Sequence, residues 1–274
     1  MNNITKLIAL DLDGTLTNEA KEITPHTLEA LMRVQRQGVR LCLASGRPPF
    51  GMRPLARLLQ MDRYGGLLLC YNGGHIEECQ TGRVLVEQAL DDSLLPYLRE
   101  CQQRSGMTLM TYYEDSIYTE HPEDEYVRIS SRNNNMRITG VRDFVSDTPR
   151  PLNKCLMVGS PTLVPQWEAI MQRETEGHMH ICRSTPYFIE LLPPGIDKGI
   201  ALERLLKGLG MTEDNLMAFG DSYNDISMLS KAGTGIAMGN AEEAVKAVAD
   251  HVTDTNDNDG VAKALDRWLG SPNA

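Results

Sequence analysis

Three short runs rich in apolar residues, each separated from the next by a helical pattern, constrain the fold of this chain most strongly. They are Leu7–Leu10, Val39–Ala44 and Leu67–Tyr71, and small polar residues follow each of them. The segments between them, about 24–38 and 48–60, carry apolar residues at helical spacing. Strands that are apolar throughout are typical of a parallel sheet covered by helices on both faces. The pattern therefore predicts an α/β sheet that binds its ligand at the carboxyl ends of the strands.

The first run ends in two acids one residue apart, Asp11 and Asp13, followed by Gly14 and Thr15. A strand alternates faces with a period of two, so the two carboxylates are expected on the same side. Neighbouring anions repel each other, and the arrangement by itself adds no stability. A bound cation, a proton held by one of the acids, or catalytic use would explain the pair.

The pattern changes after about residue 81 and returns after Pro193–Gly195. The later run Leu216–Phe219 is again apolar and ends in the polar segment Gly220–Asp225. The prediction is a doubly wound, Rossmann-like parallel core domain formed by residues 1–83 and 191–274, with an inserted α+β domain at 84–190. The elements expected in the insertion are helices at about 91–104, 122–134 and 161–176, and strands at 108–113, 117–119, 154–159, 178–183 and 187–192.

The composition excludes several classes of partner. The formal net charge of the 274 residues is -10, which argues against nucleic acid because phosphate backbones require a basic face. No stretch approaches the roughly 18 apolar residues of a membrane span. The six cysteines show neither a zinc spacing nor a disulfide framework. The apolar run before Asp11 is shorter than a signal peptide requires. We therefore expect a reduced, cytoplasmic, soluble protein.

The polar residues at the predicted strand ends form a set suited to a phosphoryl group. Carboxylate oxygens are the ligands that Mg²⁺ prefers, while a cation, hydroxyl groups and backbone N–H groups hold phosphate oxygens. A carboxylate can also act as the nucleophile and form an aspartyl phosphate. The members of this set are Asp11, Asp13, Ser45, Asn72, Lys198, Asp221 and Asp225.

Four segments together resemble the four motifs of the haloacid dehalogenase superfamily: Asp11–Thr15, Ala44–Arg47, Gly195–Gly199 and Gly220–Asp225. Their order, their spacing and the position of the insertion are similar to those of Cof-type phosphatases with a type IIB cap. The resemblance covers nearly the whole chain and implies a Rossmann-like core with an inserted α+β cap domain. It also implies a phosphatase of small phosphorylated metabolites, especially sugar phosphates.

The resemblance assigns roles to individual residues. Asp11 would attack the phosphorus, and Asp13 would protonate the leaving alcohol and then activate the hydrolytic water. Mg²⁺ would be held by Asp11, the backbone carbonyl of Asp13 and Asp221, supported by Asp225. The residues expected to hold the phosphoryl oxygens are Ser45, Gly46, Lys198 and Asn224, with Asn72 nearby.

Other interpretations of the same residues remain open at this point. A phosphomutase would use the same nucleophile, and a signalling receiver module also combines an acid cluster with a lysine. The acids of 11–22 are spaced partly like a calcium-binding EF-hand loop, but the glycine falls at the wrong position and a strand precedes it. The acid-rich segment 254–259 could be a calcium loop, but a solvated loop that caps the last helix is expected, and the resemblance places it near the rim of the site. Candidates for substrate recognition in the cap are Arg128, Arg183, Tyr187 and Glu190.

Overall fold

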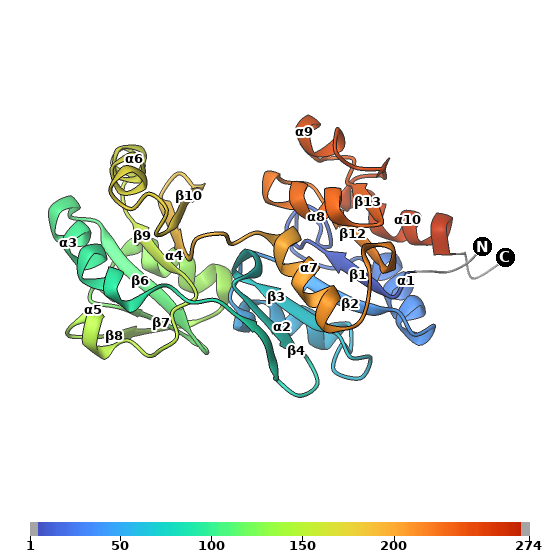
Figure 1. The fold of residues 1–274 in the computed structure, drawn as a ribbon, viewed down its shortest axis with the longest axis horizontal. Coiled ribbons are helices and arrows are strands. Elements are labelled where there is room, and N and C mark those ends of the chain that lie inside the picture. The colour runs from blue at the N-terminus through green and yellow to red at the C-terminus, as the bar shows by residue number, and fades with distance from the viewer. Residues whose placement is uncertain (1–4, 270–274) are drawn as a thin grey trace. The chain divides into compact units, whose positions relative to one another are not determined.

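The computed structural model describes residues 5–269 and divides the chain into two compact units (Figure 1). Each unit has its own hydrophobic core. The first unit is built from Met1–Gly46, Met52–Val86 and Asp197–Ala274, and the second from Arg47–Gly51 and Glu87–Ile196.

The unit boundaries lie a few residues later than the predicted positions after residues 83 and 190. The predicted first boundary cuts off β5, Val84–Glu87, which follows β4 in the sheet of the first unit. The predicted second boundary falls within β11, Phe188–Leu192, which pairs inside the sheet of the second unit. The contacts within each unit place the two boundaries after Val86 and after Ile196, so that most of β5 belongs to the first unit and all of β11 to the second.

The first unit contains an eight-stranded sheet in the order β14-β13-β12-β1-β2-β3-β4-β5. The strands from β14 to β3 are mutually parallel, and β4 runs antiparallel to β3. This arrangement confirms the predicted parallel-rich α/β sheet. The strands not yet delimited are β1 (Leu7–Leu10), β2 (Arg40–Ala44), β3 (Leu67–Cys70), β4 (His75–Glu78), β12 (Leu216–Gly220), β13 (Thr234–Ala237) and β14 (His251–Val252).

Strand β1 lies in the middle of this sheet, between β2 and β12. Leu10 is opposite Leu43 of β2 on one side and Phe219 of β12 on the other. All four residues of β1 are completely buried, as expected for a strand that is apolar throughout. The residues that follow β1, β2 and β12 therefore emerge along one edge of the sheet.

Helices cover the sheet of the first unit. Helices α7 and α8 pack on the face that carries Leu7 and Ala9, while α1 and α10 contact each other (Figure 1). Thr24 caps α1 by accepting a hydrogen bond from the backbone N–H of Thr27, and Pro25 follows it as the first helical residue. The α-helices of this unit are α1 (Pro25–Arg36), α7 (Lys198–Gly208), α8 (Ile226–Lys231), α9 (Glu243–Lys246) and α10 (Gly260–Leu269); α2 (Pro49–Leu58) begins in the second unit and continues into the first.

The second unit is a six-stranded sheet in the order β10-β11-β9-β6-β7-β8, with helices α3 to α6. Helices α3 and α6 contribute to its core, which contains Leu98 and Trp167. The strands are β6 (Thr108–Tyr113), β7 (Ser116–Thr119), β8 (Arg137–Gly140), β9 (Cys155–Val158), β10 (His180–Thr185) and β11. The helices are α3 (Leu95–Ser105), α4 (Glu125–Asn134), α5 (Phe144–Asp147) and α6 (Val164–Glu174).

Several short elements were not predicted. Strand β8 is polar and mostly exposed, and α5 has only four residues, so neither has a clear periodic pattern. No helix in the described part of the chain is long and apolar enough to cross a membrane.

Candidate active site

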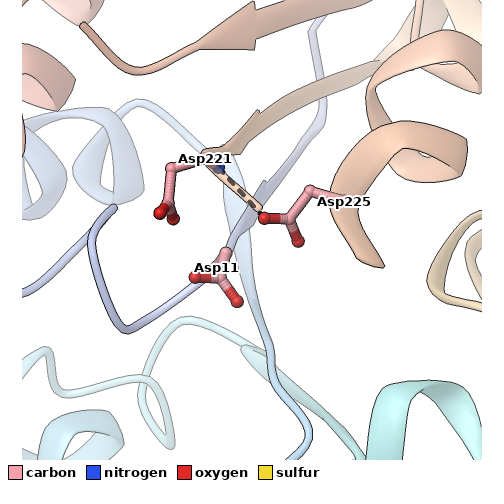
Figure 2. A group of neighbouring side chains, drawn as sticks. All are labelled: Asp11, Asp221 and Asp225. Carbon is pink, nitrogen blue, oxygen red and sulfur yellow. Dashed lines mark hydrogen bonds between the residues drawn. The ribbon is translucent and has the colours of Figure 1, made fainter. Parts of the chain in front are cut away.

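Three carboxylates from two neighbouring strand ends meet at the carboxyl edge of the first sheet. Asp11 follows β1, while Asp221 and Asp225 follow β12 (Figure 2). Each of the three offers one oxygen atom, and these atoms all lie within 4.8 Å of one another. The structure therefore brings together the acids that the sequence placed at the ends of separate strands.

Lys198 lies against this acid group, at the first residue of α7. Asp197 caps the helix by accepting the backbone N–H of Ile200 at 2.8 Å, which fixes the start of α7. The Nζ atom of Lys198 lies 2.6 Å from Oδ1 of Asp11 and 2.7 Å from Oδ1 of Asp225. The lysine is completely buried. Burial by itself lowers the pKa of Lys198, but the Asp11 and Asp225 carboxylates outweigh it and raise the pKa, so the ammonium stays charged.

The group is short of positive charge. Three carboxylates and one ammonium would sum to a charge of -2 if all were ionised. Burial raises the pKa of Asp11 to about 8, and the Asp225 carboxylate adds to this shift while Lys198 opposes it. Burial also raises the pKa of Asp221. A divalent cation would offset this excess of negative charge. The carboxylate oxygens are hard donors that suit Mg²⁺, so the residues present fit such an ion.

The Asp225 carboxylate is held by protein donors on both oxygens. Oδ1 accepts the Lys198 ammonium, and Oδ2 accepts the backbone N–H groups of Asp221 and Ser222, each at 3.0 Å. A Cβ atom at Gly220 would lie 2.4 Å from Cβ of Asp225, so this approach requires glycine. Asp225 thus organises the loop after β12 and orients Lys198.

Asp221 is oriented by a residue that the sequence analysis did not assign a role. The Thr15 hydroxyl donates to Oδ1 of Asp221 at 2.8 Å, and the Ser222 hydroxyl donates to Oδ2 at 3.2 Å. Gly14 has φ +86°, and a Cβ atom there would lie 2.5 Å from Oδ2 of Asp221. The sequence signal for this contact was the Gly14-Thr15 pair after Asp13. Gly14 leaves room for the Asp221 carboxylate, and Thr15 supplies a hydroxyl donor to it.

Asp13 has a different environment from Asp11. Strand β1 ends at Leu10, so strand alternation does not extend to Asp13. Its side chain lies outside the group of three acids found among the described residues and is 40% exposed. Oδ1 of Asp13 accepts a hydrogen bond of 2.8 Å from Nζ of Lys21, a residue that the sequence analysis did not single out. The two neighbouring acids thus contact different lysines.

The predicted phosphate-binding residues lie on loops at the same edge. Ser45 is buried directly after β2, and its carbonyl accepts the backbone N–H of Asn72 at 3.0 Å. Oδ1 of Asn72 accepts the side-chain amide of Asn224 at 3.1 Å. A Cβ atom at Gly46 would lie 3.3 Å from the Asn72 amide group. Asn72 therefore joins the turn after β2 to the loop after β12.

The candidates for substrate recognition in the second unit have separate partners. Arg128 forms an ion pair with Glu123 on the surface. Nε of Arg183 lies 3.4 Å from Oε2 of Glu168. The ring of Tyr187 stacks on Tyr126 with 5.5 Å between centroids. Glu190 forms a buried ion pair of 2.7 Å with Lys154.

The acids of the 254–259 loop also have separate partners. Asp254 pairs with Lys263, Asp257 accepts the backbone N–H of Glu19, and Asp259 accepts the Thr24 hydroxyl. Two of these contacts reach the segment between β1 and α1, so the loop is tied to a part of the chain that is distant in sequence.

Comparison with known proteins identifies the family. The model of the haloacid dehalogenase-like hydrolases matches residues 8–265. The chain belongs to this family. The prediction of a haloacid dehalogenase-type phosphatase of the Cof type is confirmed.

Relatives of this haloacid dehalogenase-like hydrolase match it over nearly its full length. A crystal structure of a haloacid dehalogenase-like hydrolase from Bacteroides thetaiotaomicron is 46% identical with a TM-score of 0.93, covering 96% of this chain and 99% of that one. The 5-amino-6-(5-phospho-D-ribitylamino)uracil phosphatase of Bacillus subtilis is 31% identical, covering 96% of each chain. The pyridoxal phosphate phosphatase of Escherichia coli is 30% identical, covering 95% of this chain and 97% of its own.

Proposed function

We propose that this hydrolase is a Mg²⁺-dependent phosphatase of small phosphorylated metabolites that works through an aspartyl phosphate on Asp11. The observation that carries the proposal is the buried ammonium of Lys198 between Asp11 and Asp225, beside Asp221. A buried carboxylate with a fixed cationic partner is positioned for attack on phosphorus at little reorganisation cost.

The residues proposed to hold Mg²⁺ are the carboxylates of Asp11 and Asp221 together with the backbone carbonyl of Asp13. Asp225 is assigned a supporting role because both of its oxygens already accept hydrogen bonds from the protein. The ion would supply the charge that lets an anionic carboxylate approach an anionic phosphate ester.

The proposed reaction has two steps. An Asp11 oxygen forms a bond to phosphorus while the bond to the ester oxygen breaks, and Asp13 gives its proton to that oxygen. In the second step Asp13 takes a proton from water, the water oxygen bonds to phosphorus, and the bond to Asp11 breaks. The products are the alcohol and inorganic phosphate, and both acids return to their starting states.

Ser45, Gly46, Lys198 and Asn224 are proposed to hold the phosphoryl oxygens. A lysine ammonium has three donors, and two of those on Lys198 are directed at carboxylates. The third donor is suited to a phosphoryl oxygen. Asn224 is oriented by its hydrogen bond to Asn72, so the loops after β2, β3 and β12 would contribute to one phosphate site.

Hydrolysis is favoured over a mutase or a phospho-accepting signalling module because the curated relatives are named as phosphatases. Sugar phosphates remain the predicted substrate class. The names of two relatives describe phosphates that also carry a heterocyclic ring, so ring-bearing phosphates belong in the same substrate panel.

The proposal is tested by measuring phosphate release from a panel of sugar phosphates, nucleotides, flavin mononucleotide and pyridoxal phosphate. Release should require Mg²⁺ and stop with EDTA. Asp11→Asn should abolish it, and Asp13→Asn should lower it by about 100-fold or more. Glu29→Gln, which changes an exposed acid on α1, is the matched control and should leave the rate unchanged. Normal turnover by Asp11→Asn would overturn the mechanism.

A further inference from the structure

Lys21 contacts the proposed acid/base residue, although nothing in the mechanism above uses it. Its Nζ atom donates to Oδ1 of Asp13 at 2.8 Å. The other lysine at the site, Lys198, serves Asp11 and Asp225. Lys21 is thus a cation in direct contact with Asp13.

The backbone at Lys21 is in a conformation that side-chain-bearing residues rarely adopt. Its φ angle is +63°, in the left-handed region, which costs an L-residue roughly 1–2 kcal/mol. Asn18 closes this turn by accepting the Lys21 N–H on its carbonyl and the Glu22 N–H on its side chain, each at 2.9 Å. Glycine or asparagine would be less strained here, so the presence of a long cationic side chain suggests a function.

The loop that carries Lys21 is anchored to a distant part of the chain. The side chain of Asn256 donates to the carbonyl of Thr17 at 2.9 Å, and Asp257 accepts the backbone N–H of Glu19 at 2.9 Å. Exposed ion pairs usually add little stability because two mobile side chains must be ordered. Here the backbone under both partners is already fixed, so the contact can define an orientation even where it contributes little stability.

We propose that Lys21 is a positioning residue for Asp13. Its ammonium holds one oxygen of the Asp13 carboxyl group, so that the group keeps a single orientation toward the ester oxygen that leaves. Lys21 transfers no proton itself. This inference rests on the proposed role of Asp13 as the acid of the first step.

The test exploits the dependence of acid catalysis on the leaving group. An alkoxide needs a proton to depart, whereas p-nitrophenolate departs without one. The alkyl substrate is the alkyl phosphate that reacts fastest in the panel. For this substrate we expect Lys21→Met to lower kcat/KM about ten-fold, which is less than the loss expected when a general acid is removed completely. The loss with p-nitrophenyl phosphate should stay below about two-fold. Lys21→Arg, which keeps a cationic donor, should restore most of the alkyl phosphate activity.

Two controls separate this role from a general effect on the fold. Nζ of Lys231 lies 2.7 Å from Oε2 of Glu203, in another exposed ion pair of the same unit. Lys231→Met removes this cation and should leave kcat/KM unchanged for both the alkyl phosphate and p-nitrophenyl phosphate. In an Asp13→Asn background, assayed at high enzyme concentration, Lys21→Met should cause no further loss, because coupled residues are not additive.

Equal losses with both substrates would overturn the proposal and indicate that Lys21 binds the phosphate or supports the fold. An undiminished or increased kcat/KM for the alkyl phosphate would overturn it as well. These outcomes differ from failure of the proposed function, in which the unaltered protein releases phosphate from no ester.

Discussion

The Thr15 hydroxyl lies 2.8 Å from Oδ1 of Asp221, although 206 positions separate the two residues in the chain. The contact joins the turn after β1 to the loop after β12. Thr15 is almost completely buried, so the hydrogen bond is shielded from water. It orients one of the two carboxylates proposed to hold Mg²⁺.

Thr15→Val should weaken metal binding while it preserves the shape of the side chain. Loss of a hydrogen bond to a ligand carboxylate typically lowers metal affinity about 10- to 100-fold. We expect the Mg²⁺ concentration for half-maximal activity to rise by about ten-fold, with most of the rate recovered at saturating Mg²⁺. Thr15→Ser retains the hydroxyl and should behave like the unaltered protein. A Mg²⁺ titration that is identical for the Val and Ser variants would contradict this assignment.

Gly14→Ala should disrupt the site by a steric clash with Asp221 as well as by backbone strain. Its φ of +86° is unfavourable for alanine, and the new Cβ atom would lie 2.5 Å from Oδ2 of Asp221. Gly38→Ala is a matched control, because Gly38 has φ +91° but nothing within 4 Å of the added atom. Urea unfolding should show a loss of about 1–2 kcal/mol for Gly38→Ala and a larger loss for Gly14→Ala. Only Gly14→Ala should lose activity.

Asn72→Gly should affect substrate binding more than turnover. Asn72 has φ +57°, which glycine also adopts, so the substitution removes the acceptor for Asn224 without straining the backbone. Loss of one hydrogen bond of this kind is worth about 1 kcal/mol, so we expect KM to rise about five-fold. Steady-state kinetics at saturating Mg²⁺ measure the effect. A lower kcat with constant KM would show instead that Asn72 acts in the transition state.

Glu77 should make the stability of the first unit dependent on pH. Burial alone would raise the pKa of Glu77, but the hydrogen bond with His75 and the guanidinium of Arg53 lower it below the ordinary value of 4.5. A lowered pKa in the folded state stabilises the protein above pH 4.5, and this contribution disappears as the pH falls through the folded pKa. Glu77→Gln should therefore cost about 1–3 kcal/mol of unfolding free energy at pH 7.

The cost of Glu77→Gln should shrink progressively below pH 4.5, which urea unfolding at pH 7, 5 and 3.5 would show. Glu29→Gln provides the control, since Glu29 is exposed and should give no difference at any pH. A cost for Glu77→Gln that stayed constant down to pH 3.5 would mean that packing, and not charge, is responsible.

The part of the site that follows strand ends could be predicted from the sequence. Asp11, Ser45 and Asp221 each come directly after an apolar run, and parallel strands end at the same edge of a sheet. The contacts between side chains could not be predicted in this way. Lys198 sits on a helix, where a lysine is ordinarily solvated, and only the packing of α7 buries it between two carboxylates.

Short polar elements and loop residues lay beyond the reach of sequence patterns. Strand β8 has no buried residue among its four, so hydrophobic alternation gave no signal. Lys21 lies in a polar loop between predicted elements, and its relation to Asp13 depends on a turn with an unusual backbone angle. Both features arise from tertiary contacts and not from local preference.

The central place of β1 in the sheet has a consequence for how the protein is made. Its neighbour β12 begins at Leu216, about 200 residues after β1 ends at Leu10. At the usual synthesis rate of about 5–20 residues per second, an interval on the order of 10 to 40 seconds separates the emergence of these two strands from the ribosome. During that time the completely buried strand β1 lacks one partner, and the complete second unit emerges before that partner arrives. Asp11 is thus synthesised long before Asp221 and Asp225, and the three carboxylates can come together only after β12 has emerged.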